Sequence, residues 1–189
     1  QRERRLVAFE ALLRTEEPTL KSPPAFVGAA ERLGRVHDLG RRVRGAVATS
    51  IVDAPAGAEI FVNLHAADLA DDELVAADAP LAAHARRVVL EITERASLEN
   101  VAGAPERIAA LRALGYRIAV DDLGAGYAGL TTLATLEPEV VKIDMTLVRG
   151  VDRDVTRQRV LHSLIELCRE LQMRAVVEGV ENGAERKVV

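Results

Sequence analysis

Six short apolar runs alternate with segments of helical periodicity, and this alternation decides which fold classes the chain can adopt. The runs are rich in Val and Ile and are apolar on both faces, which predicts strands buried between helices. Strands that alternate with helices predict an α/β fold with a mainly parallel sheet. The expected strands are Leu6–Leu13, Glu59–Leu64, Arg87–Thr93, Tyr116–Asp121, Glu139–Asp144 and Arg174–Glu178.

Between these runs, several segments carry helix signals. Ala104–Leu114 is predicted as a helix because Pro105 suits its first turn and Gly115 ends it. Asp154–Leu171 has apolar residues at helical spacing along its whole length. We also expect helices at Pro23–Leu33 and Asp38–Ala48.

The repeat length favours one architecture within the α/β class. Six strands in 189 residues give about 30 residues per strand–helix unit, close to the repeat of an eight-stranded α/β barrel. Such a barrel needs roughly 250 residues, so we expect one domain over residues 1–189 that lacks about two units at its ends. An open, doubly wound sheet is the alternative, but no Gly-x-Gly-x-x-Gly motif follows the first predicted strand.

Composition excludes several classes of protein. A net charge of −4 and an aromatic content of 3% argue against a nucleic-acid surface. A single Cys excludes a disulfide framework and suits a reducing compartment. No apolar run approaches the roughly 20 residues of a membrane helix, and the start of the chain has no signal-peptide stretch. We therefore expect a cytoplasmic domain without membrane contact.

Polar residues end nearly every predicted strand, and in an α/β barrel these ends share one face. One acidic residue at a strand end is often a helix cap, but a series of them in register needs a cation to offset the repulsion. Carboxylate and amide oxygens select Mg²⁺ or Mn²⁺ over Zn²⁺ or Cu²⁺. Two such ions about 4 Å apart activate water and stabilise a leaving oxygen in phosphodiester hydrolysis. The residues are Glu10, Asn63, Glu91, Asp121, Asp122, Lys142, Asp144 and Glu178.

Among these residues, Lys142 is the single cation. It would hold an attacking hydroxide or a phosphate oxygen; the alternative is a salt bridge within the carboxylate-rich mouth of the barrel. The pattern predicts a metal-dependent phosphoryl site.

Six motifs in order along the chain resemble the EAL domain, the cyclic di-GMP (c-di-GMP) phosphodiesterase domain of bacteria. They are Glu10-Ala11-Leu12-Leu13-Arg14, Val62-Asn63-Leu64, Glu91-Ile92-Thr93-Glu94, Asp121-Asp122-Leu123-Gly124-Ala125-Gly126-Tyr127, Lys142-Ile143-Asp144 and Glu178-Gly179-Val180-Glu181. The resemblance implies a modified TIM-like (β/α)8 barrel whose first strand is antiparallel to the others. It also implies hydrolysis of c-di-GMP to linear pGpG with two Mg²⁺ or Mn²⁺ ions.

The resemblance assigns a role to each matching residue. It implies that Glu10, Asn63, Glu91 and Asp121 bind the first metal ion and that Asp122 binds the second. Catalytic roles fall to Lys142, which positions water, to Glu178, which orients ligands or water, and to Glu94, which braces the loop after the Asp-Asp pair. Leu13 and Arg14 would bind the substrate, Arg14 through a phosphate. Asp144 and Glu181 match positions whose roles stay open.

Several departures from the family pattern leave alternatives open. The flanking Gln-Pro and Gln-Gly-Tyr motifs do not occur in residues 1–189, so the barrel is expected to be truncated at both ends. Leu123, Ala125, Ala128 and Gly129 replace the usual Phe, Thr and two Ser, and Glu185 lies near a position where many members carry Gln. Two competing hypotheses therefore remain. The first is a catalytically inactive c-di-GMP receptor or protein-interaction module, and the second is an unrelated enolase-type barrel. The family also implies a homodimer and a tethered sensor or GGDEF-type domain.

Some reactive residues are assigned structural positions. Cys168 lies on the apolar face of a predicted helix and is expected in the core. The four histidines, at positions 37, 65, 84 and 162, share no metal-binding spacing. Arg41-Arg42-Val43-Arg44 is interpreted as a solvated helix face.

Overall fold

The computed structural model describes residues 6–20, 22–93, 101–125 and 129–189. The chain forms two compact units, residues 1–90 with 97–117 and residues 91–96 with 118–189. Strand β3 (Val88–Thr93) passes from the first unit to the second. In sheet order, the strands follow one another in chain order from β1 to β6.

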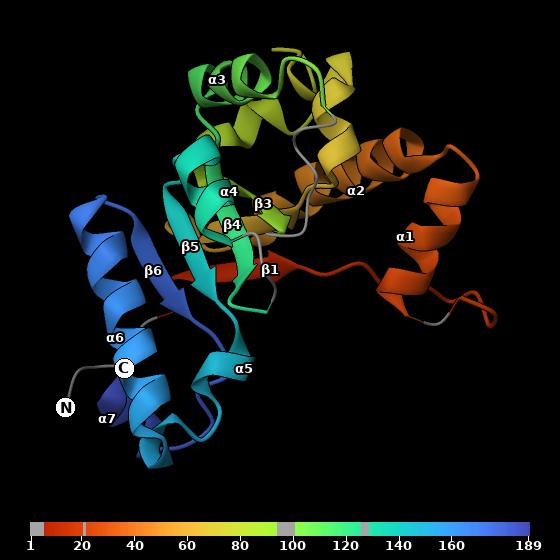
Figure 1. Cartoon of the computed structure of the whole chain (residues 1–189). Coiled ribbons are helices and arrows are strands. Elements are labelled where there is room, and N and C mark those ends of the chain that lie inside the picture. The colour runs from red at the N-terminus through yellow and green to blue at the C-terminus, as the bar shows by residue number, and fades with distance from the viewer. Residues whose placement is uncertain (1–5, 21, 94–100, 126–128) are drawn as a thin grey trace. The chain divides into compact units, whose positions relative to one another are not determined.

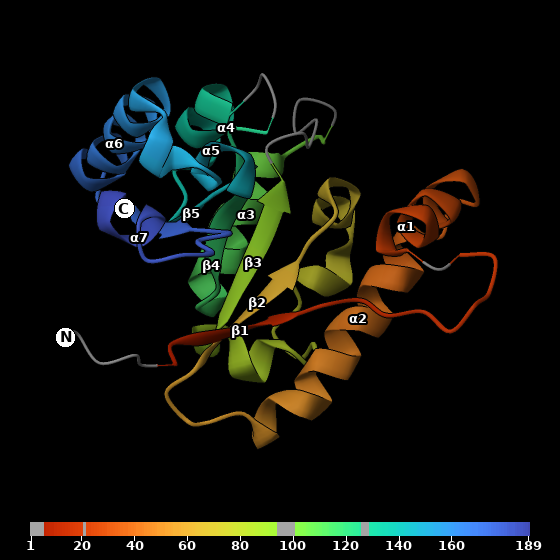
Figure 2. The same ribbon diagram turned by 90° about the horizontal axis from the view of Figure 1, so that it is seen from below.

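The first unit is built around two parallel strands. β1 (Ala8–Ala11) pairs with β2 (Glu59–Asn63), with Glu10 opposite Phe61, and α2 (Val36–Ser50) runs along the same strands (Figure 2). The unit also holds α1 (Pro23–Arg32) and α3 (Ala104–Leu114). Short 3₁₀ helices complete it at Ile51–Asp53, Ala66–Ala70, Asp72–Leu74 and Ala82–Arg87.

Local sequence explains where the helices of this unit begin and end. At the start of α1, the Ser22 Oγ accepts the N–H of Ala25, and two prolines occupy the first turn, where no N–H partner is needed. Helix α3 ends at Gly115, which has a φ of +103°. This left-handed conformation suits glycine because it carries no Cβ.

Besides the end of β3, the described residues of the second unit form three parallel strands and four helices. β4 (Arg117–Leu123) starts at its boundary and pairs with β5 (Val140–Ile143), which pairs with β6 (Arg174–Val177). The helices are α4 (Gly129–Leu136), α5 (Met145–Val148), α6 (Val155–Glu170) and α7 (Glu185–Val188), and a 3₁₀ turn spans Val151–Arg153. Figure 1 shows α6 packed along β5 and β6, where Ile143, Val148, Val151 and Leu161 form a buried apolar cluster.

The α/β fold class is confirmed: all six predicted strands and all four predicted helices are present, with boundaries shifted by a few residues. β1 runs parallel to β2, so it is not the antiparallel first strand that the family resemblance implies. Closure into an eight-stranded barrel stays a prediction. Among the described residues, the longest and most apolar helices fall short of what a membrane span requires.

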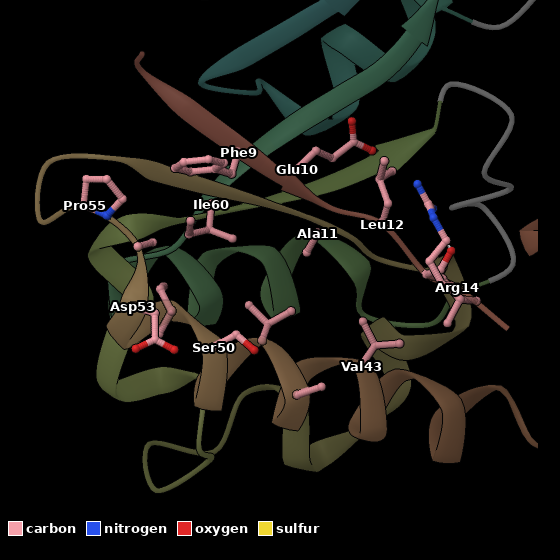
Figure 3. A pocket seen from close by; sticks show the side chains of 15 residues that line it. Phe9, Glu10, Ala11, Leu12, Arg14, Val43, Ser50, Asp53, Pro55 and Ile60 are labelled. Atoms are coloured by element: carbon pink, nitrogen blue, oxygen red, sulfur yellow. Dashed lines mark hydrogen bonds between the residues drawn. The ribbon is translucent and has the colours of Figure 1, made fainter. Parts of the chain in front are cut away.

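The prediction that the strands are buried on both faces is wrong for β1. Phe9 is 42% exposed, and the neighbouring Leu6 and Leu12 are 60% and 52% exposed. Figure 3 shows Ala11 pointing toward α2, whereas Glu10 and Leu12 point to the other face of the strand. An apolar pattern indicates which side chains tolerate burial, but burial also requires an element on each face of the strand.

Candidate active site

The Lys142 ammonium lies among three carboxylates in the second unit. Its Nζ is 2.7 Å from an oxygen of Glu91, 3.0 Å from one of Asp121 and 2.9 Å from one of Glu178. Lys142 is 5% exposed and Glu91 is 1% exposed, so these charges are largely removed from water. A buried charge is costly without a partner, and the four side chains neutralise one another in part.

Strand geometry explains this convergence. Asp121 and Lys142 lie toward the carboxyl ends of β4 and β5, and Glu178 directly follows β6. Lys142 is opposite Val176 in the β5–β6 ladder, and the backbone N–H of Glu178 donates to the carbonyl of Ile143 at 3.0 Å. Parallel strands end at one edge, so polar residues at their ends come together there.

A local irregularity presents two consecutive carboxylates. The pairing of β4 with β5 shifts register between Val120 and Leu123, and Asp122 has a φ of +57°. A regular strand would place Asp121 and Asp122 on opposite faces. The Asp121 carboxylate also accepts the backbone N–H of Asp122 at 2.9 Å.

The pKa values in this cluster reflect its crowding. Burial disfavours the charged Lys142 ammonium, but hydrogen bonds and charges from Glu91, Glu178 and Asp121 outweigh that cost and raise its pKa above the ordinary 10.5. Burial, reinforced by the negative charge of Asp121, raises the pKa of the Asp122 carboxyl above 3.8. The cluster therefore keeps Lys142 charged and makes an ionised Asp122 costly without a cation beside it.

The second unit offers a donor set suited to a divalent metal ion. One carboxylate oxygen from each of Asp121, Asp122 and Glu178 lies within 4.8 Å of the others. All three ligand atoms are hard oxygens, the type that Mg²⁺ and Mn²⁺ prefer. Burial, together with the charge of Asp121, disfavours the ionised form of Asp122, and a divalent cation held by these oxygens would favour it.

Two further matching residues of this unit have structural roles. The Asp144 carboxylate accepts the N–H of Thr146 at 2.8 Å and so caps α5. Glu181 is exposed and forms an ion pair with Arg149 at 3.0 Å. Neither contact requires a metal ion or a substrate.

In the first unit, two predicted metal ligands contact each other. The Asn63 amide donates to the Glu10 carboxylate at 3.1 Å across the β1–β2 pair. The predicted substrate residues Leu13 and Arg14 line a mainly apolar groove of about 630 Å³ between β1 and α2, with Arg14 at one end (Figure 3). The exposed Arg14 guanidinium donates to the Leu13 carbonyl at 2.9 Å.

The remaining predicted residue, Glu94, lies outside the described residues, as does Tyr127 of the Asp-Asp loop. The assignment of Glu10 and Asn63 to the same metal ion as Glu91 and Asp121 stays a prediction.

Sequence patterns missed an ion-pair network in the first unit. The interpretation of Arg41–Arg44 as a solvated face is wrong for Arg44, which is 8% exposed. Its guanidinium lies 2.7 Å from Asp71 and 3.4 Å from Asp68, and Arg41 also binds Asp71 at 2.7 Å. Cys168 is 1% exposed, which confirms its place in the core.

Comparison with known proteins identifies the family. The EAL domain family profile matches residues 1–189. The probable cyclic di-GMP phosphodiesterase PdeG of Escherichia coli K12 is 32% identical over 190 residues, which cover 95% of this chain and 38% of that protein. The chain thus spans well under half of this relative.

Two solved structures agree in fold. The manganese and c-di-GMP complex of Klebsiella pneumoniae BlrP1 gives a TM-score of 0.82 at 30% identity, covering 97% of this chain and 48% of that one. The c-di-GMP complex of the PaMucR phosphodiesterase gives a TM-score of 0.79 at 28% identity, covering 96% and 78%. The resemblance drawn from the six motifs is confirmed, and the chain belongs to the EAL domain family.

Proposed function

We propose that this EAL domain hydrolyses c-di-GMP to linear pGpG with divalent metal ions. The observation that carries the proposal is the buried Lys142 among Glu91, Asp121 and Glu178, beside the triad of Asp121, Asp122 and Glu178. Relatives named cyclic di-GMP phosphodiesterases and structures of relatives with this dinucleotide support the choice of substrate.

The proposal assigns two Mg²⁺ or Mn²⁺ ions to the acidic residues. Glu10, Asn63, Glu91 and Asp121 would hold one ion and Asp122 the other, as the family resemblance implies. The manganese complex of BlrP1 supports the choice of metal. When bound, such ions supply Lewis acidity, which lowers the pKa of water and offsets charge on a leaving oxygen.

Hydrolysis forms a bond from a water oxygen to phosphorus and breaks the phosphorus–oxygen bond to a ribose oxygen. The water loses one proton, and the departing ribose oxygen takes up one proton and becomes a hydroxyl. The charged Lys142 can hold a nucleophilic oxygen or a phosphoryl oxygen by hydrogen bond and charge. Glu178, half-buried and in contact with Lys142, can orient the water by accepting its proton in a hydrogen bond. The Arg14 guanidinium suits a phosphate because its planar fork offers two parallel donors. Glu94 is assigned the bracing role that the resemblance implies.

The proposal also covers the assembly, the neighbouring domains and the cellular location of this domain. Homodimerisation, a tethered sensor or GGDEF-type domain and a cytoplasmic location follow from the family resemblance. The 38% share of PdeG that the chain covers leaves room for such domains in the relative.

Turnover and binding of c-di-GMP, measured separately, test the proposal. Metal-free protein receives c-di-GMP with Mg²⁺, Mn²⁺ or excess chelator, and pGpG is quantified by chromatography. We expect product with either ion and none with chelator. Glu91→Gln should abolish turnover because it removes a charged ligand, whereas Glu170→Gln, an exposed site on α6, should retain it.

Different failures have different meanings. Binding of c-di-GMP in Ca²⁺ without turnover in Mg²⁺ or Mn²⁺ would refute the enzyme and favour the receptor alternative. Hydrolysis in excess chelator would refute the metal-dependent mechanism. Absence of binding would exclude both the enzyme and the receptor.

A further inference from the structure

Glu185 is a buried carboxylate outside the predicted constellation. It is 3% exposed. One of its oxygens accepts the backbone N–H of Gly150 at 2.8 Å, and the other accepts those of Glu181 at 2.9 Å and Asn182 at 3.3 Å. These three partners are all N–H donors, an environment that suits an acceptor-only carboxylate.

Part of this arrangement is a local helix cap. The Asn182 side chain accepts the N–H groups of Ala184 and Glu185 at 2.9 and 3.0 Å, and Glu185 reaches back to the Asn182 N–H. This reciprocal pattern is the capping box. A capping box involves only neighbours in sequence, whereas Gly150 lies 35 residues away along the chain.

The bond to Gly150 joins the two segments that follow β5 and β6. The first leads from the end of β5, which carries Lys142, through α5 to Gly150, and the second leads from Glu178 to Glu185, where α7 begins. A second close approach joins the same segments, because a Cβ at Gly179 would lie 2.4 Å from the Met145 Cβ. The contact with Met145 thus requires glycine at position 179, and the Glu185 carboxylate makes the contact with Gly150.

We propose that Glu185 is a positioning residue that fixes the segment carrying Glu178 against the segment carrying Lys142. Its effect on catalysis rests on the proposed function, whereas its effect on the Glu178–Lys142 contact of 2.9 Å does not. The backbone N–H of Gly150 in particular lowers the pKa of the Glu185 carboxyl, which keeps it in the ionised, acceptor-only form. A glutamine amide would instead present N–H groups to at least one of the three donors.

The test compares Glu185→Gln with two matched variants. Asn182→Ala removes the local cap but leaves the bond from Gly150 to Glu185, and Glu170→Gln makes the same chemical change at an exposed site. In metal-free protein, NMR follows the ammonium signal of Lys142 and the amide exchange of Gly150 and Glu181. With Mn²⁺ and c-di-GMP, kcat and KM are measured for each variant.

We expect Glu185→Gln to accelerate exchange of both amides at least about tenfold and to shift the Lys142 signal in the direction that Glu178→Gln shifts it. It should lower kcat at least about tenfold with KM within about twofold, and both controls should keep kcat within about threefold of wild type. If Glu185→Gln does not fold, Glu185→Asp, which keeps the charge but is too short to reach Gly150, should show the same pattern.

Two results would overturn the inference. An unchanged Lys142 signal would mean that Glu185 does not position Glu178, whatever the turnover. Equal kcat losses in Glu185→Gln and Asn182→Ala would mean that Glu185 acts only as a helix cap. A wild type without turnover, combined with the expected Lys142 shift, would refute the proposed enzyme but support the positioning of Glu178.

Discussion

Lys142→Ala should strongly destabilise the metal-free protein. The substitution removes the ammonium that lies within 3.0 Å of oxygens of Glu91, Asp121 and Glu178, so these carboxylates lose that counter-charge. Breaking a buried ion pair by removing one partner costs about 3–5 kcal/mol. For a chain of this length, 1 kcal/mol corresponds to about 2–4 °C in the midpoint of thermal unfolding, so we expect a decrease of about 6–20 °C.

Divalent cations should reverse much of this loss. Thermal unfolding is followed by circular dichroism at neutral pH, in chelator and with added Mn²⁺. Because the variant lacks its internal cation, Mn²⁺ should raise its midpoint more than it raises that of the wild type. Lys187→Ala, at an exposed position of α7, is the matched control and should change stability by no more than about 0.5 kcal/mol.

Kinetics separate the role of Lys142 in catalysis from its role in stability. If Lys142 acts on the transition state, the folded variant in Mn²⁺ should lose orders of magnitude in kcat, with little change in its affinity for c-di-GMP in Ca²⁺. A receptor would instead lose about 1–3 kcal/mol of affinity, the scale of a charged hydrogen bond. An unfolding midpoint in chelator equal to that of the wild type would refute the counter-ion role of Lys142.

Two further predictions concern the first unit. Gly40→Ala places a Cβ 2.4 Å from a carboxylate oxygen of the buried Asp68 and should cost about 1–3 kcal/mol by urea unfolding. Gly45→Ala in the same helix, with nothing within 4 Å, should instead stabilise it by about 0.5–1 kcal/mol; equal effects would contradict the packing around Gly40. The hydrogen bond from Arg41 holds the pKa of the Asp71 carboxyl below its ordinary value of 3.8. The ionised Asp71 therefore stabilises the fold fully above pH 3.8, and this stabilisation is lost as the pH falls through the lowered pKa of the folded state. Asp71→Asn should therefore flatten the acid-unfolding curve, and an unchanged slope would argue against this pair.

Much of the fold could be predicted because local signals agree with the tertiary structure. The Pro105 and Gly115 signals placed α3 at its observed bounds, since both residues act through their own backbone. The Val- and Ile-rich runs located the strands because this local signal also agrees with the tertiary structure. Short elements such as α5 were missed because four residues are too few to show a period.

Contacts between distant residues could not be predicted in this way. The spacing of Arg44 indicates a helix face but not that Asp68 and Asp71 lie against it, since those residues belong to another element. For Glu185, the Asn-x-x-Glu spacing signals a capping box, but the bond from Gly150 depends on where β5 and β6 place their loops. The sequence shows which groups a side chain can bind, but only the fold shows which distant residue lies within reach of it.

The partner also distinguishes the carboxylates predicted to bind metal from structural ones in the second unit. Asp144 and Glu185 accept backbone N–H groups, and such donors stabilise a carboxylate without any cation. Glu91, Asp121 and Glu178 instead lie around the Lys142 ammonium, at 2.7, 3.0 and 2.9 Å. Asp122 lies beside them with a raised pKa. Because acidic side chains gather at the ends of β4 and β6, we expect a divalent cation to stabilise the second unit at this place, where the motifs of Asp121, Lys142 and Glu178 meet.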